Sequence, residues 1–120
     1  VVRDVGGKGL SELQAAIDDL ARRAASGELR ADELTGACLA LSNLGMYPIE
    51  SFDAIIFPEH SAILAVGSAQ PAPVVVGGRV DVRPVAVARL AVDHRLINGR
   101  AAAEFLTRLK ELVEAAEFPL

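Results

Sequence analysis

The apolar positions form two segments with helical spacing, separated by a long stretch of short apolar runs. In the first segment they recur every three or four residues, which is the spacing of one face of a helix: Leu10, Leu13, Ile17, Leu20 and Ala24. Ser11 and Gln14 fit a capping box at its start, and Gly27 is a suitable stop. The second segment, residues 100–116, repeats the spacing with another apolar face: Ala103, Leu106, Leu109, Leu112, Val113 and Ala116.

The residues between the two helices are typical of β-structure. Short apolar runs predict strands at residues 37–41, 53–57 and 62–66, and a long one predicts a central strand at residues 85–92. Gly77 and Gly78 can supply the positive φ angles of a tight turn, so residues 74–83 predict a β-hairpin. The remaining segments are predicted as connections: a polar connector with one helical turn at residues 30–35, a turn at 42–45 and a rigid bend at 71–73. The total is two helices flanking about five strands, so the fold class is mixed α and β.

Composition narrows the possible functions. The chain has 120 residues, a net charge of −4 and 52% hydrophobic residues, which is enough for one domain or part of one. Its basic residues are scattered and do not alternate with aromatic ones, so nucleic-acid binding is not expected. The single cysteine, Cys38, excludes an internal disulfide and offers no metal cluster. The longest uncharged stretch contains Gly67 and two prolines, so no membrane span is expected.

The segment with the most chemistry is Asp93-His94-Arg95-Leu96-Ile97-Asn98-Gly99. It lies between the long apolar run and the last helix, which predicts a strand-to-helix corner. Asp93, Arg95 and Asn98 are polar groups that can set the tautomer and orientation of the His94 imidazole. A histidine in such a corner can act as a general base near neutral pH, although a structural histidine at a turn would have the same pattern. The other histidine, His60, follows a polar connector and is expected at the surface or an interface.

Several motifs in order resemble the catalytic domain of the dihydrolipoamide acyltransferases, the E2 components of 2-oxoacid dehydrogenase complexes. These motifs are the Asp-His-Arg corner with Asn98 and Gly99, the Ser-Asn-Leu-Gly segment at residues 42–45, and Ala-Ile-Leu-Ala-Val-Gly at residues 62–67. The resemblance implies an α/β (α+β) fold with a mixed β-sheet flanked by helices, the C-terminal half of a coenzyme A-dependent acyltransferase fold of the chloramphenicol acetyltransferase type. Residues 1–120 would then be one part of that domain, with its N-terminal half, the lipoyl domain and the subunit-binding domain outside this chain.

The same resemblance implies roles for individual residues. His94 would be the general base, and Ser42, reaching the site from a neighbouring subunit, would donate a hydrogen bond to the oxyanion. Asn98 stands where the family usually has aspartate, so it offers hydrogen bonds rather than a charged pair, and it can also cap the last helix. Five further residues are expected to support the site or bind substrate: Asn43, Gly45, Asp93, Arg95 and Gly99.

Partners and cofactors are also implied by the resemblance. Coenzyme A and dihydrolipoamide would be substrates, with no covalently bound cofactor and no metal. The expected assembly is a homotrimer or larger E2 core, joined to the E1 and E3 components and the lipoyl domain through domains outside this chain. A cytoplasmic location in a bacterium is expected, with a mitochondrial matrix as the alternative. The sequence does not distinguish acetyl, succinyl and branched-chain acyl groups.

Two other interpretations stay open. The chain can be a non-catalytic scaffold subunit that has kept the fold for core assembly. It can also be a proteolytic remnant whose other half remains bound, in which case the acyltransferase interpretation applies to the pair.

Overall fold

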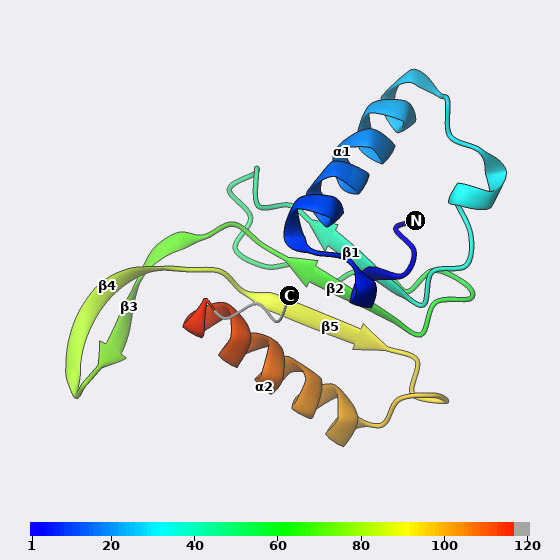
Figure 1. Ribbon diagram of the computed structural model, residues 1–120. Coiled ribbons are helices and arrows are strands. Elements are labelled where there is room, and N and C mark those ends of the chain that lie inside the picture. Colours follow the sequence, from blue (N-terminus) through cyan, green and yellow to red (C-terminus); the bar gives the residue numbers. More distant parts are fainter. Residues whose placement is uncertain (117–120) are drawn as a thin grey trace. The chain divides into compact units, whose positions relative to one another are not determined.

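The computed structural model describes residues 1–116, which divide into two units. Among the described residues, the first holds Val1–Ala37 and residues 107–116, and the second, the sheet unit, holds Cys38–Leu106. Figure 1 labels the helices α1 and α2 and the strands β1 to β5. With the two 3₁₀ turns included, the elements in order are the 3₁₀ turn Val5–Gly7, α1 Leu10–Ser26, the 3₁₀ turn Ala31–Glu33, β1 Leu39–Asn43, β2 Ala62–Val66, β3 Gln70–Val76, β4 Arg79–Val85, β5 Ala88–Val92 and α2 Gly99–Ala115.

Helix α1 confirms the first predicted helix, including its end. Gly27 adopts a left-handed conformation with φ of 74°, and its N–H donates to the carbonyls of the last turn. The start differs from the prediction, because the N-cap is Gly9 and its N–H donates to the Glu12 carboxylate at 3.0 Å. The predicted cap pair Ser11 and Gln14 is wrong, since both residues lie inside the helix.

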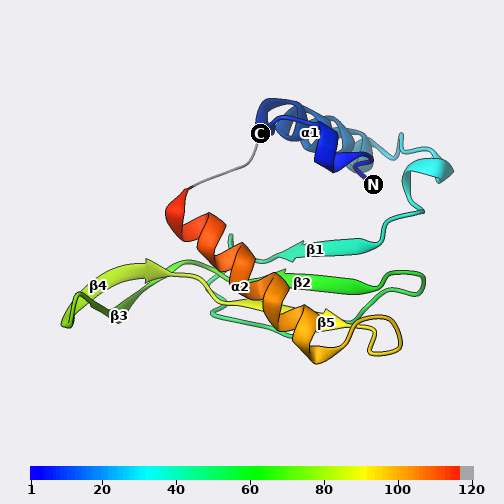
Figure 2. The ribbon, with the colours of Figure 1, turned by 60° about the horizontal axis from the view of Figure 1, so that its bottom comes forward.

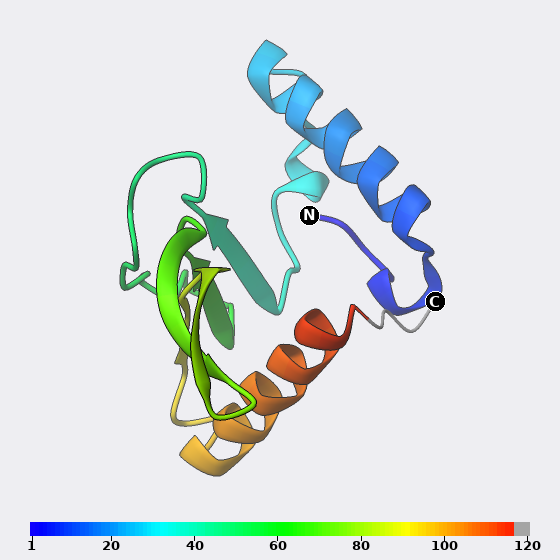
Figure 3. The ribbon, with the colours of Figure 1, turned by 90° about the vertical axis from the view of Figure 1, so that its left-hand side faces the viewer.

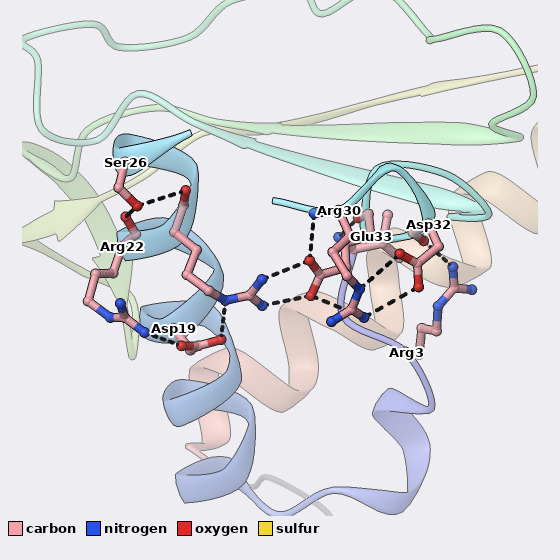
Figure 4. Close-up of polar contacts among 9 residues, drawn as sticks. Arg3, Asp19, Arg22, Ser26, Arg30, Asp32 and Glu33 are labelled. Atoms are coloured by element: carbon pink, nitrogen blue, oxygen red, sulfur yellow. Dashed lines mark hydrogen bonds and ion pairs between the residues drawn. The ribbon is translucent and has the colours of Figure 1, made fainter. Parts of the chain in front are cut away.

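An ion-pair network ties α1 to the connector that follows it (Figure 4). The Arg23 guanidinium donates to Asp19 at 2.8 Å and to both oxygens of Glu33 at 2.7 Å. Hydrogen bonds from the Arg23 side chain and from the Arg30 N–H lower the pKa of Glu33 to about 2. The side chain of Arg3 adds hydrogen bonds to the carbonyls of Asp32 and Thr35. The predicted single helical turn in this connector is confirmed as the 3₁₀ turn Ala31–Glu33.

The sheet unit contains a three-stranded sheet of order β1-β2-β5, in which β1 runs parallel and β5 antiparallel to β2 (Figure 2). Strand β2 matches the prediction and is central, and its residues Ala62, Ile63, Leu64 and Ala65 are the apolar side chains buried in the described part of the chain. The prediction of a central strand at residues 85–92 is wrong. Only residues 88–92 join this sheet, at one edge, and Val85 ends β4 instead.

Strand β1 lies two residues later than predicted. Ser42 and Asn43 were expected in a turn, but both continue the parallel pairing, opposite Ala65 and Val66. The pairing places Ser42 on a sheet face rather than in a loop. Only the turn that follows, from Leu44, matches the expectation.

The predicted strand at residues 53–57 does not form. The preceding segment is instead fastened to the end of β2, where the N–H and the hydroxyl of Ser68 donate to the Ile49 carbonyl at 2.8 and 3.1 Å. Gly67 allows this approach, since a Cβ there would lie 2.1 Å from the Glu50 carbonyl oxygen. Residues 53–57 follow a loop and pair with no described strand.

Strands β3 and β4 form the predicted hairpin, and the turn has the expected positive φ angles at Gly77 and Gly78. The hairpin is longer than predicted and curves along its length (Figure 3). It includes the residues 71–73 that were expected to form a rigid bend, because both prolines are accommodated in β3 of an isolated two-stranded ribbon.

Helix α2 confirms the second predicted helix to within one residue at each end. Its start is capped by Asn98, whose side-chain oxygen accepts the Ala101 N–H at 2.9 Å. The chain thus passes from β5 to α2 through the short corner at residues 93–98, as the sequence predicts.

Candidate active site

The corner between β5 and α2 is folded around Asp93. The Asp93 carboxylate accepts from the backbone N–H of Arg95 at 3.0 Å and from its guanidinium at 2.7 to 3.1 Å. The Asp93 carbonyl accepts from the N–H groups of Leu96 and Ile97, both at 2.9 Å. The Asp93 N–H donates to the Ser61 carbonyl at 2.8 Å, which attaches the corner to the start of β2. The backbone that carries His94 is therefore fixed on both sides.

The hydrogen bonds from the Arg95 side chain, and then from its backbone N–H, lower the pKa of Asp93 to about 2. A carboxyl group with a lowered pKa stabilises the folded state fully above its unfolded pKa, near 4, and loses that contribution as the pH falls through the folded value.

We expect Asp93→Asn to lower the denaturant midpoint of the full-length protein at pH 7. The difference from wild type should shrink as the pH falls from 4 to 2, as measured by urea unfolding. A difference independent of pH would contradict the ion-pair explanation.

The His94 side chain is exposed, and it forms no hydrogen bond with any residue that the structure describes. The expectation that its polar neighbours set its tautomer does not hold within this chain. Asp93 and Arg95 pair with each other, and the oxygen of Asn98 caps α2. Gly99 is the first residue of α2. The corner thus holds the backbone of His94 and leaves the imidazole free to meet another group.

Ser42 is a half-buried residue near the end of β1. The turn after it is closed by Asn43, whose side-chain oxygen accepts the Gly45 N–H at 2.8 Å. Gly45 suits this turn, because a Cβ there would lie 2.9 Å from that same oxygen. Asn43 and Gly45 therefore shape the backbone next to Ser42.

The structure does not bring Ser42 and His94 together within one chain. The corner that carries His94 is hydrogen-bonded to Ser61, the residue just before β2. Ser42 instead pairs with Ala65, near the other end of β2. Four residues of strand correspond to about 13 Å. The two candidate residues thus lie at opposite ends of the three-stranded sheet.

Three residues with defined contacts were not singled out from the sequence. Ser61 joins β1 to the corner, because its N–H and hydroxyl both donate to the Cys38 carbonyl at 2.9 Å while its own carbonyl holds Asp93. Arg89 of β5 pairs with Asp53 at 3.0 Å. Arg89 could have been recognised in the sequence as the charged residue inside the apolar run 85–92. Its partner could not, because Asp53 lies 36 residues earlier in the chain.

His60 is less exposed than expected. Its Nδ1 is buried without a hydrogen-bond partner among the described residues, and its ring packs edge-on against Phe57 with ring centroids 5.8 Å apart. Across residues 1–116, no three potential metal ligands gather in one place. None of the helices described is long and apolar enough to cross a membrane.

Comparison with known proteins gives a consistent result. The model of the family described as "2-oxoacid dehydrogenases acyltransferase (catalytic domain)" matches residues 1–120. The succinyltransferase component of the 2-oxoglutarate dehydrogenase complex of Rickettsia felis is 37% identical over 98% of this chain and 29% of its own length. The acetyltransferase component of the mitochondrial pyruvate dehydrogenase complex of Neurospora crassa is 37% identical over 95% of this chain and 26% of its own length.

Solved structures agree with this result. The dihydrolipoamide acetyltransferase of Azotobacter vinelandii superposes with a TM-score of 0.87 at 39% identity, covering 92% of this chain and 46% of the other. That structure was determined to study the roles of a serine, a histidine and an asparagine in the catalytic mechanism, with the serine 52 residues before the histidine and the asparagine four after it. The cubic core of a pyruvate dehydrogenase complex superposes equally well, at 40% identity. The chain spans under a third of these curated relatives and under half of these two solved chains.

Proposed function

Because the chain belongs to the family of 2-oxoacid dehydrogenase acyltransferase catalytic domains, we propose that it is part of an enzyme that moves an acyl group between dihydrolipoamide and coenzyme A. The corner residue His94 is the general base and Ser42 is the donor to the oxyanion. Coenzyme A and dihydrolipoamide are the two substrates, and the reaction uses neither a metal nor a covalently bound cofactor.

One observation carries the residue assignment. Ser42 precedes His94 by 52 residues and Asn98 follows His94 by four. The serine, histidine and asparagine studied in the Azotobacter vinelandii enzyme have the same spacing. The match also supports a role for Asn98, which stands at the position where the family usually has aspartate. Since its oxygen is used to cap α2, the amide N–H groups are the part of Asn98 left to face a substrate or partner.

The chemistry follows from the properties of thiols. A free thiol has a pKa near ~8.5, so at neutral pH a base that removes its proton raises the amount of attacking thiolate. His94 takes the proton from the attacking thiol, and the thiolate adds to the thioester carbonyl to form a tetrahedral oxyanion. The Ser42 hydroxyl donates a hydrogen bond to that oxyanion. The intermediate then collapses by breaking its bond to the other sulfur, and His94 returns the proton to the thiolate that leaves.

The distance between Ser42 and His94 sets the requirement for assembly. Since the two lie at opposite ends of the sheet, a complete site takes Ser42 from one copy of the chain and His94 from another. A homotrimer, or a larger core built from trimers, repeats such a contact with closed symmetry. The small buried core of the described residues agrees with a chain whose apolar surface is covered by the rest of its domain and by other copies in an assembly. A solved neighbour of this chain is a cubic core.

Within the cell, we place the protein in a 2-oxoacid dehydrogenase complex with E1 and E3 components and a lipoyl domain that delivers the acyl group. A bacterial cytoplasmic location fits this role. The relatives named above, from such complexes, include both succinyl- and acetyltransferases.

The proposal is tested by thioester exchange with the full-length protein. Acetyl-coenzyme A or succinyl-coenzyme A is mixed with dihydrolipoamide, and free coenzyme A and acyl-dihydrolipoamide are measured. We expect turnover with at least one of the two thioesters and equal amounts of both products. Binding of coenzyme A by a fully assembled protein without any exchange would favour the scaffold interpretation instead.

A further inference from the structure

Arg89 is the one charged side chain in the three described strands β1, β2 and β5. The other positions of these strands are apolar except for Ser42 and Asn43, which are neutral. Charged residues are uncommon in the interior of such a sheet unless they are paired, because removing a charge from water is costly. Arg89 is half-exposed and has a partner, so the sheet tolerates it, but packing alone does not require it.

The register places Arg89 on the same sheet face as Ser42. Ser42 pairs with Ala65, and Ala65 pairs with Arg89, so the three residues form one row across the sheet. Residues paired across neighbouring strands point to the same face. Two strand spacings put the backbone of Arg89 about 9.5 Å from that of Ser42. Ala65, the residue between them in this row, is buried with 2% of its surface exposed.

The Arg89 guanidinium has unused capacity for an anion. Its Nη1 donates to both oxygens of Asp53, at 3.0 and 3.2 Å, while Nε and Nη2 make no hydrogen bond with a described residue. A guanidinium presents its N–H groups as a planar fork that matches a carboxylate. Asp53 is 84% exposed, so it can yield or share this arginine at small cost.

We propose that Arg89 is a specificity-determining residue that binds the distal carboxylate of a dicarboxylic acyl group such as succinyl. This assignment rests on the proposed function. The thioester carbonyl oxygen lies at Ser42, and the far end of the acyl chain lies at Arg89. The phosphates of coenzyme A are the other anions that could reach an arginine. They are separated from the sulfur by the long pantetheine arm, so an anion bound two strand spacings from Ser42 belongs to the acyl group.

The test compares two thioesters in the full-length protein. For Arg89→Ala we expect the ratio of kcat/KM for succinyl-coenzyme A to that for acetyl-coenzyme A to fall about tenfold or more, as expected for loss of a charged hydrogen bond. Asp53→Asn should raise the same ratio, because it frees the guanidinium. Arg83→Ala is the matched control. Arg83 is a half-exposed arginine paired with Asp81 at 2.9 Å on the separate hairpin, and its loss should leave the ratio unchanged.

An unchanged ratio in Arg89→Ala would overturn the inference. If kcat/KM falls equally with both thioesters, the arginine contributes to binding a phosphate or to folding instead. The affinities of the two thioesters can also be measured by calorimetry, which requires no turnover. This measurement tests the role of Arg89 independently of the proposed function. If wild type exchanges neither thioester, the proposed function fails. Selective loss of succinyl-coenzyme A affinity in Arg89→Ala would still support Arg89, and equal affinities would contradict it.

Discussion

Replacing His94 with alanine should lower kcat for acyl transfer by about 10²–10⁴-fold, the usual contribution of a positioned general base. The corner backbone is held by Asp93 rather than by the imidazole, so the substitution leaves the local fold and the assembly unchanged. The measurement is steady-state exchange between an acyl-coenzyme A and dihydrolipoamide, with assembly followed by analytical ultracentrifugation.

His60→Gln serves as the control for this prediction. It removes the other histidine of the chain, which packs against Phe57, and should keep most of the activity. Near-normal turnover in an assembled His94→Ala protein would contradict the assignment of the base.

Replacing Ser42 with alanine should lower kcat by about 10²–10³-fold with little change in KM, because an oxyanion donor acts on the transition state rather than on the bound substrate. Ser42 lies inside β1 with its backbone paired to Ala65, and alanine suits that position sterically, so the sheet should persist. The measurement is the same exchange assay, with kcat and KM determined separately.

Ser42→Thr is the informative companion variant, since it keeps a hydroxyl and suits a strand. It should retain more activity than Ser42→Ala. Ser61→Ala is the matched control, because it removes another serine hydroxyl of the sheet unit, one that binds the Cys38 carbonyl. An equal loss in Ser42→Ala and Ser61→Ala would indicate that the hydroxyls stabilise the sheet rather than the oxyanion.

The elements predicted well from sequence are those set by local patterns. The spacing of apolar residues located α1 and α2, Gly27 ended the first helix, and the pair Gly77 and Gly78 located the hairpin turn. The corner between β5 and α2 was likewise recognisable, because a strand pattern, polar residues and a helix pattern follow one another directly.

The errors concern contacts between distant residues. Ser42 was expected in a turn because serine, asparagine and glycine favour turns, but pairing with Ala65 extends the strand through it. Residues 53–57 have a strand-like composition yet form a loop that pairs with no described strand, and pairing partners cannot be read from a local pattern. The role of Asp93 as the centre of the corner depends on backbone groups that no side-chain pattern reveals.

The separation of Ser42 from His94 within one chain was expected only from the family resemblance, which implies that Ser42 comes from a neighbouring subunit. Composition and periodicity do not reveal it, because it follows from which strands pair and in which register. The sequence motifs identified both residues as candidates. The strand register shows that Ser42 and His94 lie far apart within one chain. The central claim is therefore that the active site is shared between two copies of the chain.

Complementation between two inactive variants tests this claim most directly. Full-length Ser42→Ala and His94→Ala proteins are dissociated, mixed in equal amounts and reassembled, and the exchange rate is measured. If each site takes Ser42 from one copy and His94 from another, random mixing restores about one quarter of the sites in a cyclic oligomer. If both residues of a site come from the same chain, the mixture stays as inactive as the separate variants, and the shared site is excluded.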